Sequence, residues 1–81
     1  LGTYLPVRPG EVNLMTAGRG IVHSERTDPA LKSKAHKLHG IQSWVALPKT
    51  HEETTPGFEH VEQQELPVIT GDGKTIRVVM G

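Results

Sequence analysis

The chain contains no cysteine and few aromatic residues, and each absence narrows what it can be. Without cysteine it has no disulfide framework and no thiolate chemistry, which suits a reducing compartment. One Trp, one Tyr and one Phe leave few large side chains for a core. The hydrophobic content of 35% is low for a β-barrel that must be stable alone.

An excess of charge of either sign is also absent. Nine basic residues balance nine acidic ones, so the formal net charge is +0 with the histidines neutral. Binding to nucleic acid or to a membrane surface through bulk charge is therefore not expected. No run reaches the roughly 18 apolar residues of a membrane span, and no signal peptide is visible. We expect a cytoplasmic protein with no direct nucleic-acid partner and no membrane association.

The length of 81 residues limits the chain to one small domain, which we place over residues 1–81. A chain of this size buries only about 60–65% of its unfolded surface, so its stability is marginal. Open sheet edges would then favour a homodimer, and the competing expectation is a compact monomer with a minimal core. Because the chain does not begin with Met, we expect that residue 1 is not the natural start.

Short strands separated by turn signals dominate the pattern. The expected strands are Val12–Thr16, Gly20–Thr27, His39–Leu47, Pro67–Thr70 and Lys74–Met80. The last two form a hairpin around a Gly-Asp-Gly turn, and glycines at positions 18 and 20 allow a tight connection between the first two. This spacing is typical of an all-β sandwich or barrel.

Two segments and one side chain carry further expectations. Residues 30–38 could form a helical turn capped by Asp28 with Pro29 at its first position, or a surface loop. Residues 58–65 are ambiguous, because Phe58, Val61 and Glu65 fit a helical spacing but hardly make an apolar stripe. Trp44 is expected to be the principal core aromatic residue, and its loss would then cost ~3–5 kcal/mol.

His23 and Glu25 are the candidate metal ligands. Alternate residues of a strand share a face, so Ile21, His23 and Glu25 would point the same way. Imidazole with carboxylate suits Fe(II), Mn(II), Ni(II) or Cu(II). The structural alternative is a hydrogen-bonded His23, with Glu25 paired to Arg19 or Arg26.

No other constellation in the chain makes a stronger site. The remaining histidines lie in a basic loop or in an acidic stretch, and we do not expect them to complete the metal site. These histidines are His36, His39, His51 and His60. The glycines at positions 18 and 20 lead into a strand instead of a helix, which argues against a phosphate-binding loop. Ser24 faces away from His23, so no catalytic triad is expected.

Two separated motifs resemble the pirin family of the cupin superfamily. They are RPGEVNLMTAGRGIVHSE at residues 8–25 and LHGIQSWVALP at residues 38–48, and the likeness continues at residues 65–67 and 76–81. The resemblance implies a small jelly-roll type fold, a cupin-like β-sandwich or partial β-barrel. This chain would form the latter part of one cupin barrel, and dimerisation is one way in which the barrel could be completed. His39 and Gln42 match a family motif outside the metal shell, which implies a polar contact near the pocket or a structural hydrogen bond.

The resemblance also implies a non-haem metal site of three histidines and one glutamate. His23 and Glu25 match the third histidine and the glutamate, whereas the upstream His-x-His strand has no counterpart in this chain. The implied cofactor is Fe(II) or another divalent transition metal (Ni, Mn, Cu or Zn). The metal would be absent from this chain if His23 and Glu25 alone do not suffice to bind it.

Three functions follow from the resemblance. The first is a binding or regulatory module, with a protein partner and an incomplete or vestigial metal site. The second is a metal-dependent quercetin 2,3-dioxygenase-like oxidoreductase in which Glu25 is a ligand or a base; we expect it to be inactive in this 81-residue chain. The third is a small folded β-unit that retains no function.

Overall fold

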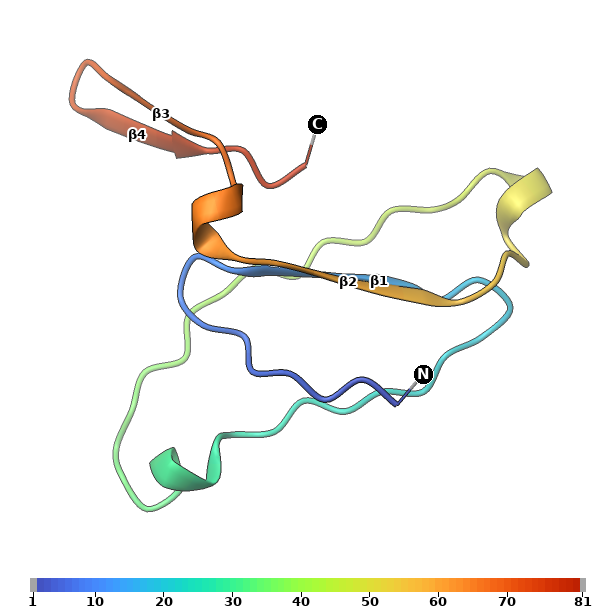
Figure 1. Ribbon diagram of the computed structural model, residues 1–81, viewed down its shortest axis with the longest axis horizontal. Coiled ribbons are helices and arrows are strands. Elements are labelled where there is room, and N and C mark those ends of the chain that lie inside the picture. The colour runs from blue at the N-terminus through green and yellow to red at the C-terminus, as the bar shows by residue number, and fades with distance from the viewer. Residues whose placement is uncertain (1, 81) are drawn as a thin grey trace. The chain divides into compact units, whose positions relative to one another are not determined.

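The computed structural model describes residues 2–80 and confirms the all-β prediction (Figure 1). Its helical elements are single 3-10 turns, and its strands form two small antiparallel sheets. The elements are β1 (Val12–Thr16), η1 (Pro29–Leu31), η2 (Lys49–His51), β2 (Gly57–Val61), η3 (Gln63–Glu65), β3 (Val68–Gly71) and β4 (Lys74–Arg77). None of the helical turns in the described residues has the length and apolar character that crossing a membrane requires.

The described chain divides into two compact units. The strand unit comprises residues 2–16 and 57–80, and the connection unit comprises residues 17–56. The prediction of one domain over residues 1–81 stays a prediction, and its end residues Leu1 and Gly81 lie outside the described part of the chain.

The first sheet of the strand unit pairs β1 with β2. The ladder runs antiparallel from the Val12–Val61 pair to the Thr16–Gly57 pair. The predicted strand Val12–Thr16 is confirmed with the same boundaries. The ambiguous segment 58–65 falls mainly on strand β2, and its last three residues form the single turn η3.

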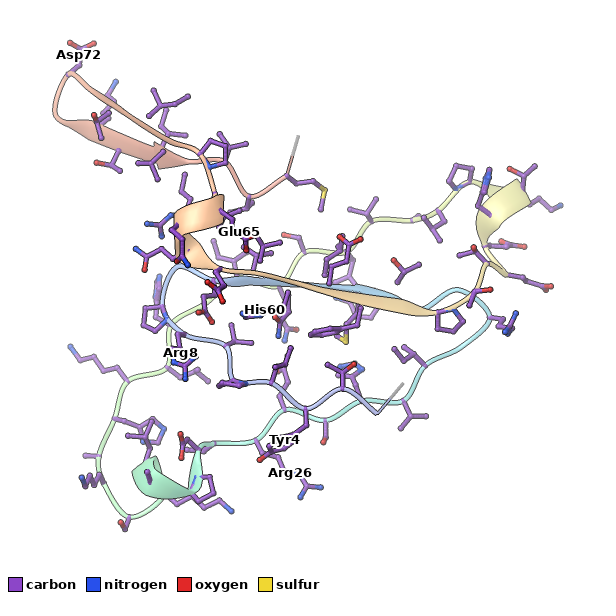
Figure 2. All side chains as sticks on the ribbon, viewed as in Figure 1. Tyr4, Arg8, Arg26, His60, Glu65 and Asp72 are labelled. Carbon is purple, nitrogen blue, oxygen red and sulfur yellow. The ribbon has the colours of Figure 1, made fainter. Side chains whose placement is uncertain are left out.

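The second sheet is the predicted hairpin. Strands β3 and β4 pair antiparallel, with Gly71 opposite Lys74, and Asp72 and Gly73 form the two-residue turn at the tip (Figure 2). Both turn residues have positive φ, 49° for Asp72 and 69° for Gly73. This is the combination that a type I′ turn requires, and Asp-Gly is among the sequences that favour it.

The buried apolar side chain of the described residues lies in the segment that connects β2 to β3. Leu66 is the buried apolar residue of the described chain, with 9% of its surface exposed. It follows η3, whose start is closed by a capping box: the Glu62 N–H donates to Glu65 Oε2 at 2.7 Å, while the Glu62 carboxylate accepts from the third residue of the turn. Both glutamates are exposed to solvent.

The connection unit is held by turns. At the turn after β1, the Arg19 N–H donates to the Thr54 carbonyl at 3.0 Å, which fixes both ends of the unit to each other. Gly18 adopts φ of +53°, and a Cβ there would lie 2.0 Å from the Thr54 oxygen. The predicted cap is confirmed at η1, where Asp28 Oδ1 accepts the Ala30 N–H at 2.8 Å and Pro29 begins the turn.

Two strand predictions in the connection unit are wrong. Residues 20–27 and 39–47 run without turn or bend, but they form no strand. The alternating pattern describes a side chain periodicity, and a strand also needs a partner for its backbone groups. The prediction for Trp44 is wrong as well, because its side chain is 92% exposed instead of buried.

Candidate functional site

The candidate metal ligands His23 and Glu25 lie in the connection unit, on the unbent segment that follows the Gly18 turn. Both side chains are exposed to solvent. The sequence predicted that a rigid strand would hold His23 and Glu25 on the same face. This segment is not part of a sheet, so strand pairing does not hold the two side chains there. Their assignment as metal ligands stays a prediction.

Gln42 brings the second sequence motif to the first. Its side-chain Nε2 donates to both oxygens of the Glu25 carboxylate, at 3.3 Å to Oε1 and 3.2 Å to Oε2. This is the kind of polar contact expected for Gln42, although the sequence did not identify Glu25 as the acceptor. One shared donor leaves most of the four or so lone-pair positions of the carboxylate available to another ligand.

Two other histidines of the connection unit, His36 and His51, have local partners. His36 Nδ1 lies 3.1 Å from the Lys34 carbonyl oxygen, and His51 Nδ1 lies 3.0 Å from Thr50 Oγ1. Among residues 2–80, no three side chains of His, Asp or Glu come together in a way that could hold a metal ion. His23 and Glu25 therefore have no third candidate ligand grouped with them in the described structure.

A polar cluster that the sequence did not predict lies in the strand unit. His60 on β2 is directly opposite Asn13 on β1, and its Nδ1 lies 2.6 Å from Asn13 Oδ1 (Figure 2). The other ring nitrogen, Nε2, lies 3.5 Å from Glu11 Oε2, and that carboxylate also accepts the Arg8 N–H at 2.7 Å.

The cluster links the two strands of the ladder. Both ring nitrogens of His60 have polar partners, Asn13 at Nδ1 and Glu11 at Nε2, so the imidazole joins β2 to β1 and to the residue before it. The signal that could have revealed it is strand pairing: once Val12–Thr16 is aligned with Gly57–Val61, the two residues face each other.

A shallow hollow of about 290 Å³ lies over residues 49–54. Its lining consists of consecutive residues around η2, including Glu52 and Glu53. It is the concave side of one turn, and it brings together no residues from distant parts of the sequence.

Comparisons with known proteins identify the family. The sequence model of the Pirin family matches residues 1–45. A Pirin-like protein of Caulobacter vibrioides is 43% identical over 82 aligned positions, which cover 100% of this chain and 28% of the relative. A Pseudomonas aeruginosa protein provisionally named a quercetin 2,3-dioxygenase is 40% identical over 81 residues, or 100% of this chain and 24% of the relative. Human Pirin is 36% identical over 75 residues, covering 93% and 24%.

No solved structure matches the chain significantly. The chain spans about a quarter of the length of these curated relatives. The matches run through both sequence motifs, and the range matched by the family model, residues 1–45, spans the positions of His23, Glu25 and Gln42. With its all-β fold and these matches, the chain belongs to the pirin family of the cupin superfamily.

Proposed function

We propose that this chain is a binding or regulatory module that supplies His23 and Glu25 to a transition-metal site and that the site is incomplete within the chain. The observation that carries the proposal is the Gln42–Glu25 contact, which joins the two motifs of the family at a candidate ligand. Carboxylates that bind metals are commonly oriented by a hydrogen bond of this kind.

The incompleteness follows from ligand number. Catalytic sites for zinc use about three protein ligands and structural sites use four, and other divalent transition metals have similar needs. His23 and Glu25 supply two, and no third His, Asp or Glu joins them in a cluster within residues 2–80. The pair therefore does not fit a resident metal on its own, and we assign it no catalytic step.

Metal retention tests the proposal. The chain is loaded with Fe(II) without oxygen and desalted, and the bound metal is counted per chain. We expect little metal to remain, and we expect retention to rise sharply when a strand with a His-x-His pair is added before residue 1. His23→Ala in the extended chain should abolish that gain, whereas His36→Ala should leave it intact.

Two results would contradict the proposal. Near-stoichiometric metal in the unextended chain, lost in His23→Ala, would mean that the site is complete within one chain or between copies. Unchanged retention after the strand is added would mean that His23 and Glu25 are not part of a metal site.

The regulatory part of the proposal is tested by partner binding. A metal ion changes the local charge at the Glu25 carboxylate, and a change of charge can alter what a surface binds. We expect a protein partner to be captured by the metal-loaded extended chain and not by its His23→Ala variant. Equal capture of the partner by both variants would mean that partner binding does not depend on the metal.

The alternative function is a quercetin 2,3-dioxygenase-like oxidoreductase. It is favoured by the provisional names of relatives from Pseudomonas aeruginosa and Thermoplasma acidophilum, the second being 32% identical over 83 aligned positions. In this function Glu25 would bind the metal or act as a base toward the flavonol hydroxyl. We expect no quercetin consumption or oxygen uptake by the 81-residue chain with added Fe(II) or Ni(II), and turnover would establish the alternative.

A further inference from the structure

The tip of the β3–β4 hairpin carries an aspartate followed directly by a glycine. Asp72 and Gly73 form its two-residue turn, and Figure 2 shows the Asp72 carboxyl group projecting from the tip. Both residues are exposed to solvent. Within the described residues, the Asp72 carboxyl group forms no ion pair and the Gly73 N–H donates to no backbone carbonyl. Neither group is therefore held by a partner in the folded chain.

The backbone nitrogen of Gly73 is open to attack on its neighbour. A Cβ built at Gly73 would meet nothing within 4 Å, so the space around the tip is free. Glycine has no side chain that could obstruct its own nitrogen. A bond from this nitrogen to the Cγ of Asp72 would close a succinimide ring together with the Cβ, Cα and main-chain carbonyl carbon of Asp72. The reaction needs only these two adjacent residues and water.

We propose that the Asp72–Gly73 bond is a site of spontaneous isoaspartate formation. In the first step the Gly73 nitrogen attacks the Cγ of the protonated Asp72 carboxyl group, and a C–N bond forms. One carboxyl oxygen leaves as water, taking with it the carboxyl proton and the proton of the Gly73 N–H. The product is a succinimide, and no atom is oxidised or reduced.

Water then opens the succinimide at either of its carbonyl carbons. Attack at Cγ breaks the new C–N bond and restores aspartate. Attack at the main-chain carbon of Asp72 breaks the original peptide bond, so the chain afterwards runs through Cβ and Cγ and the α-carboxylate is free. The water lost in the first step is regained, and the mass of the chain is unchanged. The freed α-carboxylate is the group that a carboxyl methyltransferase specific for isoaspartate would take as its substrate.

The modified turn would no longer match the hairpin that it closes. Two residues with φ of 49° and 69° connect the paired Gly71 and Lys74. Isoaspartate adds one backbone atom to this connection, and the length and type of the turn set the register of a hairpin. We therefore expect the modification to loosen the pairing of β3 with β4 and to leave the pairing of β1 with β2 unchanged.

The same chain contains two matched controls. Asp28 is also exposed, but it precedes Pro29, whose nitrogen carries no proton to lose and therefore does not form the neutral succinimide. Asn13 precedes Leu14 within β1, where the ladder with β2 holds the backbone extended. The sequence has no further aspartate or asparagine. The selectivity of the reaction for Asp72 can therefore be measured in one sample.

Ageing the full 81-residue chain at neutral pH tests the proposal. The incubation is made in water enriched in the heavy isotope of oxygen, and peptide mapping by mass spectrometry locates isoaspartate and the incorporated label. We expect labelled isoaspartate to form at position 72 about tenfold faster, or more, than at positions 28 and 13, a difference of about 1.4 kcal/mol in the barrier.

Two variants test the route through the succinimide. Asp72→Glu should lose the product, because its longer side chain closes a larger ring more slowly. Asp72→Asn keeps a sequence that favours the same turn and reaches the same succinimide by losing ammonia in place of water. Its labelled products should therefore show the same ratio of isoaspartate to aspartate as the labelled products of the original chain.

Isoaspartate confined to position 72, its loss in Asp72→Glu and equal product ratios in the Asn variant support the proposal. No isoaspartate at position 72, or an equal rate at position 28, would overturn it. Product without heavy oxygen, or unequal ratios, would overturn the succinimide route. Hydrogen exchange of the separated isoaspartyl form then examines the hairpin, and unchanged protection of the β3 and β4 amides would overturn the expected loosening.

Discussion

The strand unit and the connection unit both contain segments predicted to be strands, but the two units differ in whether those segments form a sheet. In the strand unit, Val12–Thr16 lies opposite Gly57–Val61 and forms a ladder. In the connection unit, residues 39–47 have the stronger alternating pattern, yet they remain unpaired and exposed. The difference shows that alternation prepares a segment for a sheet, and that an available partner strand decides whether the sheet forms.

The largest expected effect concerns the little core that exists. Leu66→Ala removes the buried apolar side chain of the strand unit and should lower the free energy of unfolding by about 3 kcal/mol. Leu38→Ala makes the same change at an exposed position of the connection unit and should cost less than about 0.5 kcal/mol. Urea unfolding at low protein concentration measures the loss of stability in each variant. Equal losses would mean that the Leu66 side chain is no more important for stability than the exposed Leu38 side chain.

The second effect concerns the turn that closes the connection unit. Gly18→Ala adds a Cβ 2.0 Å from the Thr54 oxygen at a backbone φ of +53°, and we expect a cost of about 2 kcal/mol. The matched control is Gly40→Ala, where the added Cβ meets nothing within 4 Å. Hydrogen exchange of the Arg19 amide, which bonds to Thr54, should accelerate in the first variant and stay unchanged in the second.

The third effect concerns the polar link across the ladder. A double-mutant cycle with Asn13→Ala and His60→Ala should give a coupling energy of about 1 kcal/mol, the usual net value of a hydrogen bond. Leu14 and Glu59, an exposed pair on the same ladder, provide the control cycle, which should give a coupling near zero. If the two cycles agreed, the contact of His60 with Asn13 would add nothing to the pairing of the strands.

The smallest expected effect is at Trp44. At a concentration where the chain is monomeric, Trp44→Ala should change the free energy of unfolding by less than about 0.5 kcal/mol, because the ring is exposed. The tryptophan emission of the original chain should then match that of indole in water. A cost of several kcal/mol in the monomer would restore the expectation that Trp44 is a core residue.

Sequence reasoning succeeded where the structure depends on neighbouring residues. The Asp72–Gly73 turn needs two residues that accept positive φ, and the Asp28 cap needs one side-chain oxygen two residues before a free N–H. Such features are encoded within a few positions. The boundaries of β1 were also predicted, because the strand ends at turn residues on both sides.

Sequence reasoning failed where the structure depends on distant residues. The prediction of a strand over residues 39–47 used side-chain alternation and could not supply the missing partner. The contact between Glu25 and Gln42 and the contact between Asn13 and His60 each join different segments, so no local pattern specifies them. The resemblance to the pirin family identified His23, Glu25 and Gln42 as noteworthy, but the sequence did not identify which of them touch.

The position of the connection unit has a consequence for the order of folding. Residues 17–56 lie between Thr16 and Gly57, which are paired neighbours at one end of the β1–β2 ladder. The hairpin β3–β4 closes over two residues and can form in about 1–10 μs, whereas the ladder must first close a long loop. We therefore expect the hairpin to form early and the ladder late. Since doubling a flexible loop costs only about 0.6 kcal/mol in closure entropy, the connection can accept inserted sequence at little thermodynamic expense.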